Sequence, residues 1–294
     1  MKWLAGIDGG GTSTRLEIRD TANQSIADFQ FGPFNISSIG ESAFCDLLQT
    51  LWTACPPMAD CVSLCIGGAG VSSPAIRQLV EHSLAARGFS GTLTLCSDFE
   101  IALRGAINGP GCILIAGTGS VGFGQNADGQ SVRVGGWGHL IDDLGSGYAL
   151  GRAALALTVQ TLDGRADAHT LSQAICKATS SQSIQDILKY VYYSGRDKSA
   201  VAALAKTLIE CAQSGDENSM DLLRQGVSDL SCIVQTLSRR LAMPFPQTAL
   251  LGGLLAHDSV YRTLAVEELS KIARVVPALH DALWGAAQLA YEKL

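Results

Sequence analysis

The fold is decided by the stretch Trp3-Leu4-Ala5-Gly6-Ile7-Asp8-Gly9-Gly10-Gly11-Thr12, in which an apolar segment is followed directly by a glycine loop that begins with an acid. The run 3–7 predicts a buried strand. Two further strands are expected at 15–20 and 25–31, the first with alternating polar and apolar residues. The sequence therefore predicts a strand, a glycine loop and a strand pair at its beginning.

The same order returns in the second half of the chain. A buried-type strand at 112–116 runs into Gly117-Thr118-Gly119-Ser120. Strands expected at 121–124 and 131–134 flank Asp128-Gly129, a dipeptide typical of a hairpin turn. We infer an α/β protein whose two halves arose by duplication.

The remaining elements are predicted from periodicity and from helix and turn signals. Further strands are expected at 62–66, 92–96 and 248–251, and helices around 44–51, at 75–87, behind residue 98, over most of 148–243 and at 281–293. The halves are expected to meet near Gly109-Pro110-Gly111. We therefore predict domains at 1–109 and 110–280, a helical insertion in the second, and residues 281–294 packed back onto the first.

Composition excludes several classes of protein. The chain has 294 residues, 47% of them hydrophobic, a net charge of -6 and no basic run, so no electrostatic footprint for nucleic acid or an anionic membrane is present. Charge and glycine interrupt the N-terminal sequence too early for a signal peptide, which predicts a cytoplasmic protein. The nine cysteines occur singly, mostly in apolar runs, and are expected to be reduced core residues rather than zinc ligands.

The first glycine loop is typical of a phosphate-binding site. Backbone N–H groups can converge on phosphate oxygens where glycine lets the chain turn tightly, and hydroxyl groups can add to them. The phosphate-binding candidates here are Gly9, Gly10, Gly11, Thr12 and Ser13. The Asp8 carboxylate can hold the waters of a Mg²⁺ ion that bridges nucleotide phosphates. Taken alone, the loop is also compatible with a plain glycine-rich turn.

The second loop matches the dinucleotide-binding pattern G-x-G-x-x-G over residues 117–122. That pattern requires a helix to begin in the loop, whereas here a hairpin is predicted, which disfavours a dinucleotide-dependent oxidoreductase. No Gly-Lys dipeptide occurs, so a Walker A loop is absent. Gly117, Thr118, Gly119 and Ser120 are therefore predicted to bind phosphate in another way.

With a third glycine pair at Gly252-Gly253, the order of loops resembles the actin, heat-shock ATPase and sugar kinase superfamily. Within it, the chain most resembles the N-acetylglucosamine kinase and glucosamine kinase group, also called the benzoyl-CoA reductase activator type ATPase family. The residues that carry this narrower resemblance are Asp8 to Thr12, Ser97-Asp98, Ala116 to Ser120, Gly135 to Gly138 and Asp143 to Gly147. The resemblance implies two ribonuclease H-like domains with a cleft between them, ATP and Mg²⁺ as cofactors, a sugar substrate and a homodimer.

The resemblance also assigns Asp98 as the base toward the sugar hydroxyl. Physical reasoning agrees, because an acid at the carboxyl end of a parallel strand lies where such sheets bind ligands. A Ser-Asp pair before a helix is also typical of an N-cap. Gly252 and Gly253 match the loop that holds adenosine.

Four more residues match sugar-binding positions of the resembled group. Asn35 matches its sugar-binding asparagine, and Asp143 matches an acid that accepts hydrogen bonds from two sugar hydroxyls. Trp137 and Gly138 match a segment that lines the sugar pocket, although a tryptophan before a turn can also be a core residue. Leu144 stands where the group has a polar residue, so the resemblance assigns no role to that side chain, and this departure is the weak point of the sugar hypothesis.

Alternatives of other classes remain open. Some members of the broad family activate a redox enzyme through an iron–sulfur cluster held by cysteines after the second loop, but no cysteine lies between Cys112 and Cys176 here. A sugar-binding transcription regulator is disfavoured, because no helix-turn-helix segment or basic arm precedes Trp3. The sequence does not decide between N-acetylglucosamine, glucosamine and another hexose as acceptor.

Overall fold

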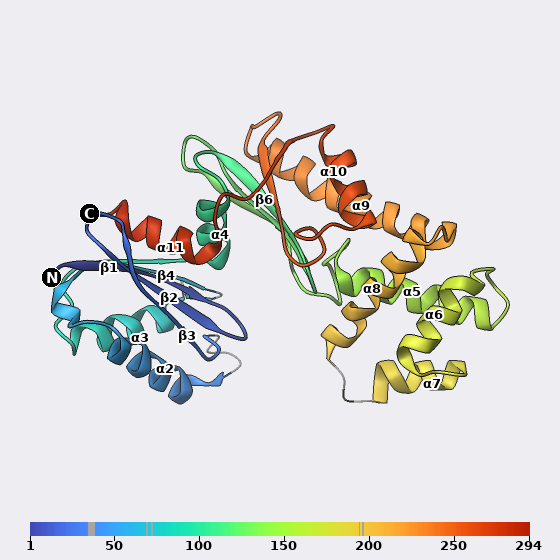
Figure 1. The fold of residues 1–294 in the computed structure, drawn as a ribbon, viewed down its shortest axis with the longest axis horizontal. Helices are drawn as coiled ribbons and strands as arrows, with labels where there is room; N and C mark the ends of the chain where they lie inside the picture. Colours follow the sequence, from blue (N-terminus) through green and yellow to red (C-terminus); the bar gives the residue numbers. More distant parts are fainter. Residues whose placement is uncertain (35–38, 69, 72, 194, 196) are drawn as a thin grey trace. The chain divides into compact units, whose positions relative to one another are not determined.

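A computed structural model describes residues 1–34, 39–68, 70–71, 73–193, 195 and 197–294. The chain forms two compact units, shown as ribbons in Figure 1. The first unit comprises Met1–Gly109 and Ala278–Leu294, and the second comprises Pro110–Pro277.

The first unit is built on a mixed five-stranded sheet with the order β3-β2-β1-β4-β5. Its strands are β1 (Trp3–Gly9), β2 (Thr14–Asp20), β3 (Ser25–Phe31), β4 (Cys61–Gly68) and β5 (Thr92–Cys96). Strand β2 runs antiparallel to both β1 and β3, whereas β4 is parallel to β1 and β5 is parallel to β4. The carboxyl ends of β1, β4 and β5 therefore lie at one edge of the sheet.

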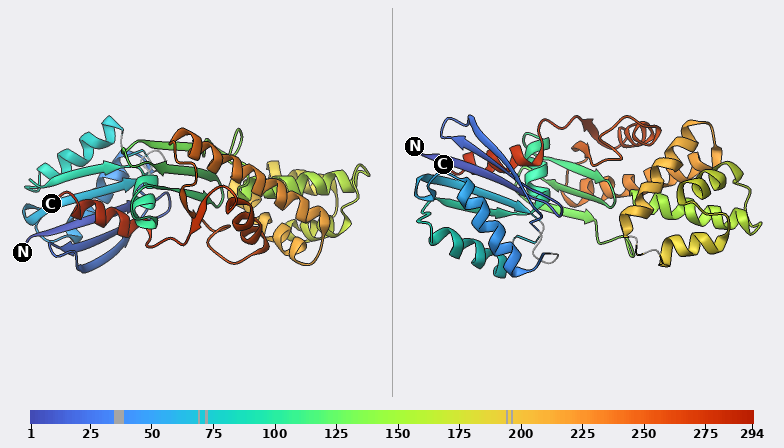
Figure 2. Two further views of the ribbon diagram at one scale, coloured as in Figure 1. Left: turned by 90° about the horizontal axis from the view of Figure 1, so that it is seen from above. Right: turned by 60° about the horizontal axis from the view of Figure 1, so that its bottom comes forward.

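Helices cover both faces of this sheet (Figures 1 and 2). Alternate residues of β1 face opposite ways: Trp3 and Ile7 enter a core with α2 (Glu41–Ala54), the short η1 (Met58–Asp60) and α3 (Pro74–Ala85). Leu4 faces the other way, into a smaller core with α4 (Asp98–Ala106) and the last helix, α11 (Ala282–Tyr291). This alternation is the period of two that any strand imposes.

The second unit repeats the first sheet. Its strands are β6 (Gly111–Ala116), β7 (Ser120–Gln125), β8 (Ser131–Gly135), β9 (Gln247–Leu251) and β10 (Arg274–Val276), in the order β10-β9-β6-β7-β8. As in the first sheet, the opening three strands are antiparallel, and β9 returns parallel to β6. The prediction of an α/β protein with two related halves is confirmed.

The helical insertion lies between β8 and β9. It consists of α5 (Gly147–Leu162), α6 (His169–Thr179), α7 (Ile184–Leu188), η2 (Lys189–Tyr193), α8 (Lys198–Gln213) and α9 (Glu217–Arg240). Helix α9 contacts β6, β7 and β8, while α5 packs on α6 and α8. After β9 come α10 (Val260–Leu269) and β10, neither of which the sequence patterns predict.

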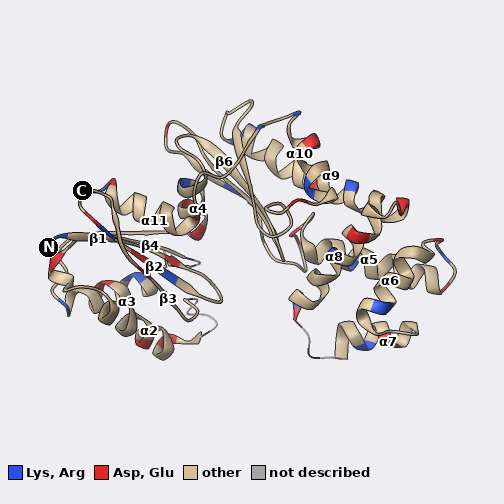
Figure 3. Ribbon diagram, in the orientation of Figure 1, with Lys and Arg blue, Asp and Glu red and all other residues tan. Residues whose placement is uncertain are grey.

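Charges of both signs are interspersed on the helices of the second unit, as Figure 3 shows. One such pair is Lys206 with Glu210, one turn apart on α8. None of the described helices is both long and apolar enough to cross a membrane.

Candidate active site

The first glycine loop connects β1 to β2 at the edge of the first sheet where the parallel strands β1, β4 and β5 end. It is closed by the Gly10 N–H, which donates to the Ser13 carbonyl at 2.9 Å, and the Phe34 N–H donates to the Gly10 carbonyl at 2.9 Å. Glycine is required at position 9, because an added Cβ would lie 2.5 Å from the Phe34 ring. An added Cβ at Gly11 would meet nothing within 4 Å. The tip of the loop, Gly11 and Thr12, is exposed.

Asp8, the predicted magnesium-associated acid, is part of an ion network. Arg15 donates from Nη2 to Asp8 Oδ2 at 2.7 Å and from Nη1 to Asp281 Oδ2 at 2.6 Å. Asp281 also caps α11, because its Oδ1 accepts from the Trp284 N–H at 2.9 Å. Burial lowers the pKa of Arg15, but the hydrogen bonds and charges of the two carboxylates raise that pKa above its ordinary value. The guanidinium thus links the first loop to the last helix.

Asp98 is the first residue of α4, directly after β5. The N-cap is Ser97, whose side chain accepts from the Glu100 N–H at 3.2 Å, while Glu100 Oε2 accepts from the Ser97 N–H at 2.7 Å. The capping alternative for Asp98 is therefore wrong, because Ser97 and Glu100 form a complete capping box. Asp98 is half-buried at the same sheet edge as the first loop.

Asn35, the predicted sugar-binding asparagine, lies outside the described residues. Its neighbour Phe34 is 1% exposed and packs edge-on against Phe44, with the ring centroids 5.0 Å apart. The chain is thus anchored immediately before position 35.

The second glycine loop connects β6 to β7 and is held by the start of α5. The Gly147 N–H donates to the Gly117 carbonyl at 2.8 Å, and the Tyr148 N–H donates to the Thr118 carbonyl at 3.2 Å. The Ser120 hydroxyl is buried and donates to the Leu144 carbonyl at 2.6 Å. The Ser120 hydroxyl thereby fixes the 143–144 segment beside the loop.

Asp143 lies directly against the second loop. It is 5% exposed, has a left-handed backbone with φ of 59°, and its Oδ2 is 2.8 Å from the place where a Cβ of residue 119 would stand. Gly119 is therefore needed for the Asp143 carboxylate to fit. The neighbouring Leu144 is 48% exposed, and its backbone carbonyl rather than its side chain takes part in this arrangement.

The third glycine pair adjoins the second loop, because β9 runs parallel to β6 and both strands end at the same edge. Gly252 has φ of 86°, and a Cβ there would lie 2.4 Å from the Ala116 carbonyl oxygen. The Leu254 N–H donates to that oxygen at 3.0 Å. An added Cβ at Gly253 would meet nothing within 4 Å. The second unit thus brings Gly117 to Ser120, Asp143 and Gly252-Gly253 together.

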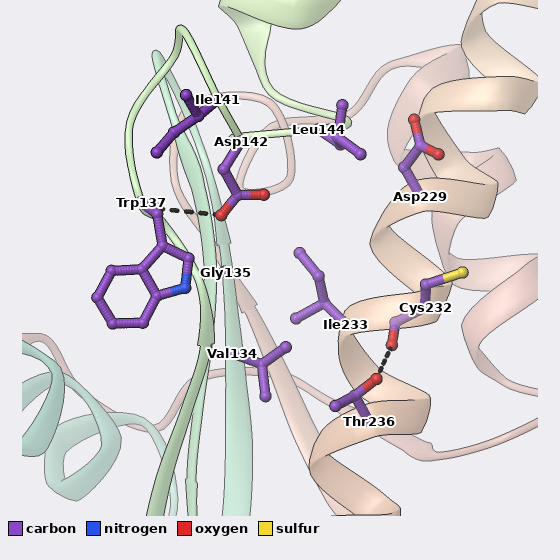
Figure 4. A pocket seen from close by; sticks show the side chains of 10 residues that line it. All are labelled: Val134, Gly135, Trp137, Ile141, Asp142, Leu144, Asp229, Cys232, Ile233 and Thr236. Carbon is purple, nitrogen blue, oxygen red and sulfur yellow. Dashed lines mark hydrogen bonds between the residues drawn. The ribbon is translucent and has the colours of Figure 1, made fainter.

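Trp137 borders a cavity of about 490 Å³ in the second unit (Figure 4). Its side chain is 63% exposed, so the alternative of a core residue is wrong. The Arg133 guanidinium stacks 4.2 Å from the indole ring centre, and the Trp137 N–H donates to Asp142 Oδ2 at 3.1 Å. The cavity is lined by Val134, Gly135, Trp137, Ile141, Asp142, Leu144, Asp229, Cys232, Ile233 and Thr236. Gly138, the other predicted residue of this segment, has φ of 107°.

All nine cysteines are free. Burial raises the pKa of Cys61 and of Cys112 to about 12. Cys232 is exposed, and Cys45, Cys55 and Cys176 are half-buried, so the prediction that the cysteines are core residues is only partly correct. Within the described part of the chain, no group of three or more His, Cys, Asp or Glu side chains is arranged to hold a metal ion.

Sequence reasoning missed Arg15 and Asp281. Arg15 could have been found, because a hairpin that brings residue 9 opposite residue 14 also brings Asp8 opposite Arg15. Asp281 gives no such signal, since it is 266 positions away from Arg15 in the chain.

Comparisons with known proteins extend through both units. The model of the BadF/BadG/BcrA/BcrD ATPase family matches residues 5–290. An N-acetylmuramic acid/N-acetylglucosamine kinase of Clostridium acetobutylicum is 32% identical over 263 residues, 87% of this chain and 86% of that protein. A glucosamine kinase of Vibrio cholerae is 27% identical over 299 residues, 99% of this chain and 96% of that protein. The crystal structure of a candidate N-acetylglucosamine kinase from Chromobacterium violaceum superposes with a TM-score of 0.76 at 27% identity and covers 99% of both chains.

Proposed function

Because the chain belongs to the BadF/BadG/BcrA/BcrD ATPase family, we propose that it transfers the terminal phosphate of ATP to the 6-hydroxyl of an amino sugar, N-acetylglucosamine or glucosamine. The kinases named above support the acceptor class. The observation that carries the proposal is the edge of the first sheet, where the Asp8 glycine loop follows β1 and Asp98 follows β5, two strands that flank β4 and end at the same edge.

The donors near the first loop fit a magnesium ion that arrives with the nucleotide. Mg²⁺ in such sites is held by substrate phosphates, water and one or two carboxylates. Asp8 offers one carboxylate, whose Oδ2 accepts from Arg15 and whose Oδ1 is left to accept hydrogen bonds from metal-bound water. When bound, the ion would neutralise charge on the phosphates.

Asp98 is proposed as the base. As the acceptor hydroxyl attacks the terminal phosphorus, Asp98 takes its proton, and the bond from phosphorus to the bridging oxygen of ADP breaks. The backbone N–H groups and hydroxyls of residues 9–13 and 117–120 are proposed to bind the phosphates, and Gly252-Gly253 the adenosine. Asn35, Trp137, Gly138 and Asp143 are proposed to bind the sugar; the Asp143 carboxylate can accept hydrogen bonds that sugar hydroxyls donate.

The direct test is ADP release measured with a panel of N-acetylglucosamine, glucosamine, N-acetylmuramic acid, glucose and mannose. The expected result is stimulation by an amino sugar, with the product phosphorylated at position 6 by NMR. Asp98→Asn should keep ADP binding and lose at least about 99% of turnover, because removing a general base costs roughly 10² to 10⁴ in rate.

The matched control is Glu41→Gln, which removes an acid from the same first position of another helix, α2. It should leave turnover unchanged, so that the loss in Asp98→Asn cannot be attributed to helix electrostatics. If no sugar stimulates ADP release, or if Asp98→Asn is fully active, the proposal fails.

We further propose a cytoplasmic homodimer, as the resemblance to this kinase group implies. Light scattering on the purified protein would test the dimer, and a monomeric mass at assay concentrations would exclude it.

A further inference from the structure

Arg15 bridges two carboxylates, those of Asp8 and Asp281, which are far apart in the sequence but belong to the same unit. It faces Asp8 across the first hairpin, and its two terminal nitrogens bind different partners, Asp8 Oδ2 at 2.7 Å and Asp281 Oδ2 at 2.6 Å. The Asp8 side chain is 19% exposed and that of Arg15 is 37% exposed. The Asp8 carboxylate is therefore fixed by a cation that lies beside the predicted phosphate loop.

We propose that Arg15 is the counter-ion and positioning residue of Asp8, and that it lets the first glycine loop accept nucleotide phosphates before magnesium is in place. The inference rests on the proposed function only in assigning nucleotide phosphates to this loop.

The reason is the sign of the charges. Asp8 and the nucleotide phosphates are both anionic, so they repel each other unless a cation lies near. Magnesium supplies that cation once it is bound, whereas Arg15 supplies it permanently. Free ADP carries more negative charge than its magnesium complex, so loss of Arg15 should weaken binding of free ADP more.

The second contact of Arg15 explains the choice of arginine. Asp281 is held in place because it caps α11, a helix that packs on β1 and α4. A planar guanidinium can bind Asp281 and Asp8 at once and so orient the Asp8 carboxylate, whereas a lysine is a single flexible point charge. Arg15→Lys should therefore keep the charge and lose the orientation.

The test is titration of a fluorescent ADP analogue, with EDTA or with excess Mg²⁺. Arg15→Met should weaken metal-free binding by about tenfold or more, and binding with Mg²⁺ by at most about threefold. Arg15→Lys should recover most of the metal-free affinity, yet turn over more slowly at saturating substrate. Asp281→Asn should weaken metal-free binding less than Arg15→Met, since asparagine caps a helix as well as aspartate does.

Arg104→Met is the matched control. Arg104 pairs with Glu292 just beyond the other end of α11, and its Nε to Oε1 distance is 3.0 Å, so this variant removes an ion pair from the same helix without touching Asp8. It should leave both ADP affinities unchanged.

Three results would overturn the inference: unchanged ADP binding in Arg15→Met, equal loss with and without Mg²⁺, or the same loss in Arg104→Met. Failure of the sugar kinase proposal is separate, because these titrations contain no sugar. A chain that binds ADP with this pattern but phosphorylates none of the sugars would retain the role of Arg15 and lose the proposed acceptor.

Discussion

Gly119→Ala tests the contact between the second glycine loop and Asp143. The φ of Gly119 lies outside the left-handed region, so alanine suits the backbone. The added Cβ would stand 2.8 Å from Asp143 Oδ2 and 3.1 Å from its carboxyl carbon. The substitution therefore acts by displacing one carboxylate.

The size of the displacement sets the expected effect. A carbon–oxygen contact relaxes to about 3.3 Å, so the carboxylate must move by roughly 0.5 Å. Misplacement of a group by about 1 Å can lower the rate roughly a hundredfold. For a displacement about half as large, we expect the rate to fall about tenfold, or ~1.4 kcal/mol. Asp143 is 5% exposed, and the adjoining Leu144 carbonyl accepts from Ser120, so the segment has little room to yield.

A double-mutant cycle is the assay. We expect Gly119→Ala to lower kcat/KM for the sugar about tenfold with ADP binding nearly intact. In the background of Asp143→Gly, which removes the carboxylate and suits a left-handed backbone, the same substitution should cost little. Additive effects in the cycle, or an equal loss of ADP affinity, would refute the reasoning, and thermal unfolding must show each variant folded.

Two other predictions concern nucleotide binding and stability. Alanine at Gly11, Gly117 or Gly253 should leave the melting temperature unchanged or slightly raised, because an added Cβ meets nothing closer than 3.9 Å in the protein. The same substitutions should weaken ADP binding, because a bound nucleotide would contact the added Cβ. Full ADP affinity in all three variants would argue against nucleotide binding by these loops. Burial raises the pKa of Asp281, but the hydrogen bonds from the Trp284 N–H and Arg15 lower it by more, so that the pKa lies below its ordinary value of 3.8. The ionised Asp281 carboxylate therefore stabilises the folded protein fully at pH values above its unfolded-state pKa of 3.8. This stabilisation is lost as the pH falls through the lower pKa of the folded state. Asp281→Asn should reduce the melting temperature at pH 7, and the difference from the parent protein should vanish in acid; a gap that widens in acid would contradict the assignment.

The sheets were largely predictable because their strands are long enough to show a pattern. Ser25–Phe31 and Thr92–Cys96 form at the residues that the patterns predict, and the recurrence of a glycine loop after Ala116 foretold the repeated topology. The edge strand β10 has three residues, Arg274–Val276, and so few residues show no period. It forms because it pairs with β9, a neighbour far away in sequence.

The candidate site shows the same division between local and distant effects. The Ser97-Asp98 pair before a helix predicted an N-cap. Ser97 is the capping residue because Glu100, three positions later, completes a capping box with it. The contact of Gly119 with Asp143 joins two motifs that the sequence presents separately, and no local rule relates them. Such a contact depends on how α5 and the loop before it return to the sheet.

That contact also separates two reasons for glycine in the predicted binding loops. A side chain at position 9 would collide with the Phe34 ring, one at position 119 with the Asp143 carboxylate, and one at position 252 with the Ala116 carbonyl. Packing alone therefore accounts for glycine at these three positions. Gly11, Gly117 and Gly253 are different, because an added Cβ would fit at each. One of them stands in each loop, and glycine costs conformational entropy that alanine would save. Glycine at these positions is what the proposed phosphate and adenosine contacts predict, because a ligand close to the backbone would leave no room for a Cβ.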